Sequence, residues 1–191
     1  MQPITRKEVL GLGDYEQIRT HFRARVIEEK RARRVMLGSN MSATFENRDT
    51  VLYQIQEMLR TERITSEPGI AHEIETYNDL LPGASQVSMT LFIEIAEKEE
   101  RERVLTELAG LEQHVGLEVG GTLYRATEKD RSVEGITRTT AVHYFKIDLD
   151  AGAVAAMRGG AVATVVIDHP RHALRVALDR ATVASLARDF S

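Results

Sequence analysis

The sequence has no cysteine among its 191 residues. This absence excludes disulfides, thiolate nucleophiles, and zinc or iron–sulfur clusters held by cysteine. Long apolar runs are also missing, because no window approaches the roughly 20 apolar residues of a membrane span. The N-terminal segment MQPITRK lacks the apolar stretch of a signal peptide. We therefore expect a cytoplasmic protein without a membrane segment.

The overall charge is mildly acidic, with a net charge of -4 at pH 7 and an isoelectric point near 5.9. This balance argues against binding to a polyanion such as nucleic acid. The exception is the segment of residues 23–34, which holds six basic and two acidic side chains. No aromatic residue lies within it, so a solvated helix face is the favoured interpretation and a nucleic-acid-binding helix is the alternative.

The composition is that of an ordinary globular protein, with 42% hydrophobic and 28% charged residues. A chain of this length can bury about 70% of the surface that its unfolded form exposes. No repeat, low-complexity tract or linker interrupts the sequence. We expect a single globular domain over residues 1–191.

The first part of the chain is predicted to be helical. A short helix starts at the capping box of Thr5 and Glu8 and stops at the glycines of segment 11–13. Asp14 is expected to cap a longer helix, whose apolar stripe contains Ile18, Phe22 and Val26.

Alternation of apolar and polar residues predicts strands in most of the remainder. A hairpin is expected within residues 35–46, and further strands at residues 86–95, 115–119, 122–126, 141–149, 161–167 and 173–178. Helices are expected from the Asn47 cap to residue 61, at residues 69–80 and 98–111, from the Asp150 cap to residue 159, and at the C-terminus. Residues 128–138 are polar and predicted to form a loop. This order favours an α+β fold with a mainly antiparallel sheet packed against several helices.

The helix predicted at residues 47–61 has a charge at each end of its apolar stripe. At about 100° per residue, Arg48 and Glu62 project onto the same face as the apolar residues. Their separation of roughly 21 Å along the axis prevents them from pairing with each other. Arg48 could bind Glu46, Glu94, or the carboxylate or phosphate of a ligand.

Three further side chains stand out in the predicted strands and turns. Glu94 lies on the less apolar face of strand 86–95, whereas His143 lies on an apolar face. His143 is either a core histidine with a hydrogen-bonded neutral ring or a ligand-binding group. His169 is either a simple turn residue or a rigidly held ligand or base whose second nitrogen is oriented by a carboxylate.

Short motifs spread over nearly the whole chain resemble one bacterial protein family. The helix entry Phe-Glu-Asn-Arg-Asp-Thr at residues 45–50 is the most specific, and Tyr-Gln-Ile-Gln-Glu-Met follows at residues 53–58. Further matching motifs lie at residues 22–26, 62–64, 77–78, 81–83, 90–94, 141–145 and 168–170. These motifs are similar to those of the family called domain of unknown function 3501.

The resemblance implies a role near redox or peroxide metabolism, with rubrerythrin-like and iron–sulfur protein partners. It does not imply a mechanism. The motif residues that it carries over are Glu46, Asn47, Arg48, Glu57, Glu62, Tyr77, Asn78, Glu94, His143 and His169. A homodimer is the usual default for a bacterial protein of this size.

Three functional hypotheses follow. The first is a cytosolic accessory or small-ligand-binding protein, with one polar pocket formed by Glu46, Arg48, Glu62, Tyr77, Asn78, Glu94, His143 and His169. The second is an enzyme that uses a metal ion held by His143 and His169 with Glu46, Glu62 or Glu94, a ligand set suited to iron, manganese or zinc. The third is a protein that binds nucleic acid through residues 23–34.

Overall fold

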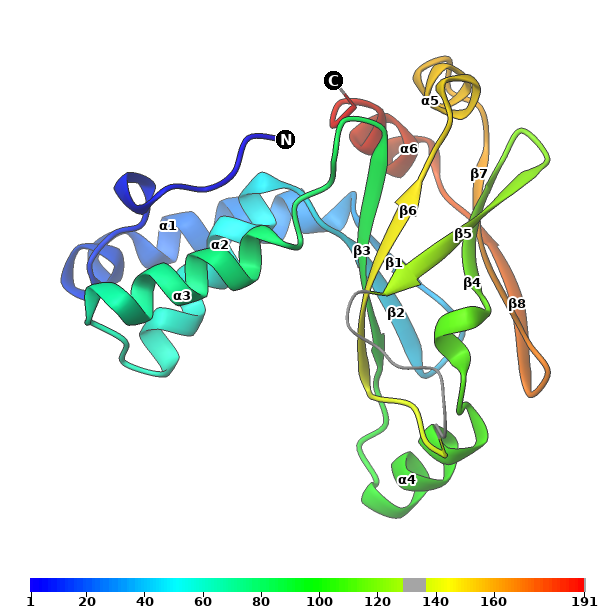
Figure 1. Ribbon diagram of the computed structural model, residues 1–191, viewed down its shortest axis with the longest axis horizontal. Helices are drawn as coiled ribbons and strands as arrows, with labels where there is room; N and C mark the ends of the chain where they lie inside the picture. The colour runs from blue at the N-terminus through cyan, green and yellow to red at the C-terminus, as the bar shows by residue number, and fades with distance from the viewer. Residues whose placement is uncertain (129–136, 191) are drawn as a thin grey trace.

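The computed structural model describes residues 1–128 and 137–190, which form an α+β fold (Figure 1). The helices of these ranges are α1 (Leu12–Arg31), α2 (Arg48–Thr61), α3 (Glu67–Asn78), α4 (Lys98–Glu107), α5 (Ala151–Arg158) and α6 (Arg180–Ala187), with short 3-10 helices η1 (Arg6–Glu8) and η2 (Leu111–Gln113). The strands are β1 (Arg34–Met36), β2 (Met41–Phe45), β3 (Gln86–Ile93), β4 (Val115–Val119), β5 (Thr122–Glu128), β6 (Val142–Asp148), β7 (Ala163–His169) and β8 (His172–Ala177).

The strands form one curled sheet in the order β1-β2-β3-β6-β5-β4-β7-β8, and every pairing is antiparallel. The central strand β5 changes partner along its length. Residues 122–125 pair with β4, whereas residues 126–128 pair with β6. One strand therefore joins the two halves of the sheet. The predicted α+β class with an antiparallel sheet is confirmed.

The concave side of the sheet encloses the larger apolar core. Alternate residues of the strands enter it, such as Phe45, Met89 and Phe145, each at most 1% exposed. Helices α4, α5 and α6 add apolar side chains to the same cluster, among them Leu105, Met157 and Leu186. The period of two in a strand places all of these strand residues on one face.

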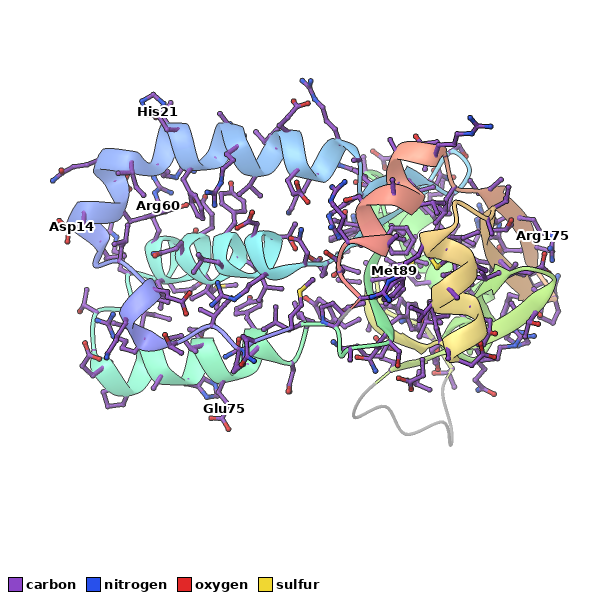
Figure 2. The ribbon with its side chains drawn as sticks, turned by 90° about the horizontal axis from the view of Figure 1, so that it is seen from above. Asp14, His21, Arg60, Glu75, Met89 and Arg175 are labelled. Carbon is purple, nitrogen blue, oxygen red and sulfur yellow. The ribbon has the colours of Figure 1, made fainter. Side chains whose placement is uncertain are left out.

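A second apolar core lies among the N-terminal helices. Figures 1 and 2 show α1, α2 and α3 side by side, next to the sheet. Residues of α2 and α3 and the two residues Ile4 and Val9 that flank η1 fill this cluster, which includes Val51, Ile55, Leu59 and Ile70. Hydrophobic burial between α2 and its neighbours therefore holds the helical layer together.

The other face of β2 and β3 is buried although it is polar. Ser42, Thr44, Ser88 and Thr90 alternate with the core residues, and none is more than 5% exposed. Small hydroxyl side chains can be buried when their oxygens find hydrogen-bond partners. The helical layer covers this polar face, and the space between them forms the cavity described below.

Several local predictions are confirmed and others are wrong. The side chains of Asn47 and Asp150 accept hydrogen bonds from the backbone amides of Thr50 and Ala153, as expected of helix caps. The expected break between the first two helices lies earlier than predicted, between Glu8 and Leu12, and the N-cap of α1 is Gly11 in place of the predicted Asp14.

The apolar stripe predicted for α1 is also incorrect in part. Ile18 is 43% exposed, whereas Tyr15 and Val26 are buried. The hydroxyl of Tyr15 and the guanidinium of Arg19 both donate hydrogen bonds to Glu57 of α2. The side of α1 that carries Tyr15 and Arg19 therefore faces α2. Most of the loop predicted at residues 128–138 lies outside the described residues. None of the described helices is both long and apolar enough to cross a membrane.

Arg33 connects the helical layer to the C-terminal end of the chain. Its guanidinium is 1% exposed and forms two hydrogen bonds to Asp189, at 2.6 and 3.0 Å, and one to Glu29 at 2.8 Å. It also donates to the carbonyl oxygen of Ser185. Burial alone would lower the pKa of Arg33, but hydrogen bonds and charges of Asp189 and Glu29 outweigh it and raise that pKa. Arg33 is therefore a charged group inside the protein.

Candidate functional site

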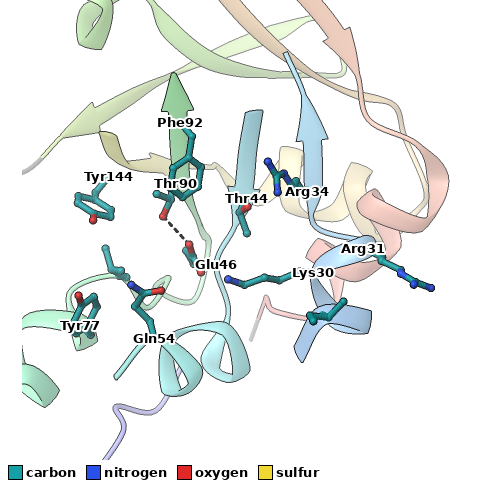
Figure 3. A pocket seen from close by; sticks show the side chains of 12 residues that line it. Lys30, Arg31, Arg34, Thr44, Glu46, Gln54, Tyr77, Thr90, Phe92 and Tyr144 are labelled. Atoms are coloured by element: carbon teal, nitrogen blue, oxygen red, sulfur yellow. Dashed lines mark hydrogen bonds between the residues drawn. The ribbon is translucent and has the colours of Figure 1, made fainter. Parts of the chain in front are cut away.

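A cavity of about 410 Å³ separates the helical layer from the polar face of the sheet (Figure 3). Its floor comes from β2, β3 and β6, and its walls come from α1, α2, α3 and the residues next to them. The residues that line it are Ile27, Lys30, Arg31, Arg34, Thr44, Glu46, Gln54, Tyr77, Leu80, Thr90, Phe92 and Tyr144.

Glu46 lies in the middle of this group (Figure 3). It follows β2, and its backbone amide donates to the carbonyl oxygen of Ser88 at 2.8 Å. Its two carboxylate oxygens accept hydrogen bonds from the hydroxyls of Thr50 and Thr90, at 2.5 and 2.6 Å. The side chain is only 9% exposed, and no ion pair to it is found within residues 1–128 and 137–190. The site thus presents a buried, hydroxyl-bound carboxylate to the cavity.

The cations around the cavity differ in what they bind. Arg31 points away from the cavity and pairs with Glu28, whereas Arg34 pairs with Glu94. Lys30 extends toward Glu46 (Figure 3), and its ammonium also lies 5.6 Å from the centre of the Tyr53 ring. In the described part of the chain, Lys30 forms no ion pair. It is therefore the cation most available to a bound molecule.

Aromatic and apolar side chains complete the site. Tyr77 and Tyr144 face the cavity from the helical layer and from β6, and Phe92 lies beyond Thr90 on β3 (Figure 3). Tyr144 is 46% exposed, which is high for a tyrosine in a sheet. These rings offer flat apolar surfaces beside a carboxylate and an ammonium group.

A second cavity of about 280 Å³ adjoins the first and shares Tyr77, Leu80 and Tyr144 with it. Its other lining residues are Thr76, Asp79, Ser88, Glu128 and Lys146. Together the two cavities run along the outer face of β3 and β6.

Two of the residues predicted from the sequence line the first cavity, namely Glu46 and Tyr77. Glu94 adjoins it through Arg34, with which it pairs at 2.8 Å. The Ser42 hydroxyl and the Arg34 guanidinium, against the opposing effect of burial, hold the pKa of Glu94 below its usual value.

Arg48, Glu62 and Asn78, which the sequence predicted in the same pocket, do not line this cavity. Arg48 leaves the apolar stripe at the first turn of α2, where it pairs with Glu8 at 2.5 Å. Glu62 is the exposed residue that follows the end of α2, so it faces no core. The amide of Asn78 binds the backbone of Ile4 at 2.8 and 2.9 Å. Arg48 and Asn78 therefore attach the N-terminal segment to the helices.

The two predicted histidines lie elsewhere. His143 is fully buried on the concave face, opposite Leu91 in the register, and its ring nitrogens contact Glu128 and Thr139. Because successive strand residues point to opposite faces, His143 cannot share the cavity that Tyr144 lines. His169 makes 3.2 Å contacts with the carbonyl oxygen of Ala109 and the amide of Arg171.

A metal centre is not formed by the predicted ligands. Across residues 1–128 and 137–190, no three His, Asp or Glu side chains converge so that they could hold a metal ion. His143, His169, Glu46 and Glu62 each have the separate surroundings given above. The structure therefore does not bring these four described residues together as one set of ligands.

The basic segment is largely neutralised by ion pairs. Arg25 pairs with Asp49, Arg31 with Glu28, Arg33 with Glu29 and Asp189, and Arg34 with Glu94. Four of its six basic side chains thus already have acidic partners. The segment is mainly a helix face that binds neighbouring elements of the same chain.

Asp168, the carboxylate next to His169 in the sequence, contacts another histidine. Asp168 forms a 3.1 Å contact with Nδ1 of His114 and pairs with Arg125. The hydrogen bond from Arg125, followed by that from His114, lowers the pKa of Asp168 to about 2 against the opposing effect of burial.

Asp168 is expected to stabilise the fold only above acidic pH. The pKa of this carboxyl is higher in the unfolded chain than in the folded protein, where it is about 2. The stabilisation is therefore complete above the unfolded-state pKa and is lost as the pH falls to about 2. The melting temperature of the protein should exceed that of Asp168→Asn at pH 6, and the difference should vanish near pH 2. A difference that does not depend on pH would contradict this assignment.

Sequence reasoning missed most of the residues that form the site, including Lys30, Gln54, Thr90, Tyr144 and Lys146. A signal for some of them exists. Thr90 lies on the polar face of an otherwise apolar strand, and Tyr144 and Lys146 lie on the polar face of the next one. Two adjacent strands with matched polar faces indicate a covered polar surface.

A family model and a solved structure each match essentially the whole chain. The family model described as "Protein of unknown function (DUF3501)" matches residues 3–190. The chain belongs to this DUF3501 family. A crystal structure of a protein of unknown function from Burkholderia pseudomallei K96243 is 33% identical, with a TM-score of 0.93 and 100% of both chains covered. No curated protein matches the sequence. The DUF3501 fold described here is thus shared with that solved structure.

Proposed function

We propose that this DUF3501 protein binds a small molecule in the cavity around Glu46. The observation that carries the proposal is a buried carboxylate, held by two threonine hydroxyls, that faces a cavity of about 410 Å³. Burying a charged group costs free energy unless the group is paired or hydrogen bonded. A carboxylate that lacks an ion pair within the described ranges offers a bound molecule a strong interaction.

The charges of the site favour a zwitterionic ligand. Glu46 and Lys30 line the same cavity, and Lys30 extends toward Glu46 (Figure 3). A molecule that carries a carboxylate beside an ammonium group could pair with both. The rings of Tyr77 and Tyr144 would contact an aromatic or large apolar side chain. We therefore propose a compact α-amino acid or a similar molecule as the ligand class.

A role in redox or peroxide metabolism, with rubrerythrin-like and iron–sulfur partners, stays a prediction that rests on the family resemblance alone. The same is true of the homodimer. Binding of a small ligand is compatible with an accessory role in such a pathway.

The test uses L-phenylalanine as a probe, followed by ligand-observed NMR and calorimetry. We expect binding of L-phenylalanine and weaker binding of phenylethylamine, 3-phenylpropionate and glycine, each of which lacks one of the three groups. Glu46→Gln should weaken binding of L-phenylalanine by about tenfold or more, since a hydrogen bond to a charged group contributes about 1.5–3 kcal/mol.

Glu62→Gln is the matched control, because Glu62 is exposed at the end of α2. It should leave the affinity unchanged. Melting temperatures of both variants show whether the fold is retained. No binding of any of the four probes, or equal binding by Glu46→Gln and the unchanged protein, would contradict the proposal.

A further inference from the structure

Lys146 lines the second cavity from the outer face of β6. It lies directly opposite Ser88 of β3 in the sheet register and two residues from Tyr144, on the same face. The side chain is therefore held by the sheet next to an open space of about 280 Å³.

The surroundings of its amino group are unusual for a lysine. Nζ donates a hydrogen bond to the carbonyl oxygen of Leu81 at 2.6 Å. In the part of the chain that the structure describes, Lys146 forms no ion pair with a carboxylate. Buried lysines usually have an acidic partner that keeps the ammonium charged. Lys146 is anchored by a neutral oxygen instead.

Burial lowers the pKa of Lys146 to about 8, although the charges of Asp79, Glu46 and Asp148 act in the opposite direction. At pH 7.4 about a fifth of such a group is the neutral amine, compared with about a thousandth for an ordinary lysine. A neutral amine in a cavity is a nucleophile toward carbonyl groups.

We propose that Lys146 is a covalent binding site for small carbonyl compounds. The Nζ lone pair attacks the carbonyl carbon and forms a C–N bond, and a proton moves from nitrogen to oxygen to give a carbinolamine. Loss of the hydroxyl as water, with the second nitrogen proton, gives the imine. No oxidant or reductant takes part, and water reverses the reaction.

The lining of the cavity indicates which carbonyl compounds fit. Tyr77, Leu80 and Tyr144 present aromatic and apolar surfaces, whereas Asp79 and Glu128 add two carboxyl groups. The ligand class is therefore an aldehyde with an apolar or aromatic body. This inference concerns the second cavity and does not require an amino acid in the first.

The experiment uses benzaldehyde as the probe with cyanoborohydride as the hydride donor that reduces the imine to a stable secondary amine. Peptide mass mapping of the intact, folded chain then gives the labelling rate of each lysine. We expect Lys146 to be labelled at least tenfold faster than Lys7, Lys30 and Lys98 at pH 7.4. Its benzylation rate, corrected for the intrinsic pH dependence of the reduction, should be half-maximal near pH 8. Labelling of Lys146 no faster than that of Lys7, Lys30 and Lys98 would overturn the proposal.

Two controls sharpen the result. Lys146→Arg should remove the fast labelling, whereas Lys98→Arg should leave it unchanged. Glu46→Gln should retain the fast labelling of Lys146, so failure of amino acid binding and failure of this inference are distinguishable.

Discussion

Replacing Arg33 with alanine is expected to lower the free energy of unfolding by about 3–5 kcal/mol, because the substitution leaves buried carboxylates without their cation. Asp189 loses two hydrogen bonds and Glu29 loses one. Asp189 is the more affected, since its side chain is 12% exposed, compared with 30% for Glu29. Urea unfolding followed by circular dichroism measures the change.

The matched control is Arg31→Ala. Arg31 also pairs with a glutamate of α1, at 2.9 Å, but both side chains are about 70% exposed (73% and 69%). An exposed pair contributes about 0–1 kcal/mol. Equal effects of the two substitutions would show that the burial of Arg33 does not determine its contribution.

Phe145→Ala is expected to cost about 3–5 kcal/mol of stability, the usual range for removal of a buried aromatic ring. Phe145 is fully buried in the larger core, and its ring stacks on that of His143 with centroids 5.4 Å apart. The substitution removes this contact and leaves a void within the curled sheet. Calorimetric unfolding should show a strongly reduced melting temperature.

The neighbouring residue provides the comparison. Tyr144 precedes Phe145 but points to the opposite face of β6, where it is 46% exposed beside the cavity. Tyr144→Ala should cost about 1 kcal/mol or less, as is usual for surface positions, and should weaken binding of L-phenylalanine. Similar losses of stability in both variants would contradict the assignment of the two faces.

The fold class could be predicted because apolar and polar residues alternate along the strands. Met89 and Leu91 alternate with Ser88 and Thr90, and the register confirms that the two sets lie on opposite faces. Helix caps were also predictable, since Asn47 bonds a backbone amide only three residues away. Local patterns of this kind depend on few residues and are little affected by the rest of the chain.

The candidate site could be predicted only in part. Glu46 was found through the family motif at residues 45–50 and as a possible partner of Arg48, but its two hydroxyl partners lie four and 44 residues away. Helical projection placed Arg48 in the core, whereas a long side chain at a helix end can reach a neighbouring segment, here Glu8. The strand pattern alone does not show which face of a sheet is covered by a second layer of helices.

Arg33 shows that long-range contacts outside the candidate site are also hard to predict from the sequence. Its position among several basic residues indicated a solvated face, and its acidic partner Asp189 is 156 residues away. A long-range ion pair leaves no periodic signal in the sequence. The charges of a segment therefore predict its surroundings less well than its apolar residues do.

The two-sided pairing of β5 has a mechanical consequence. Its first residues are bonded to β4 and its last residues to β6, so the halves of the sheet share one backbone instead of meeting along a seam. Detaching either half from β5 would break the hydrogen bonds between that half and β5. The floor under Glu46 and Lys146 lies within one half, where β2, β3 and β6 pair with one another along their lengths, so we expect adjustment to an incoming molecule to come from the helices above it.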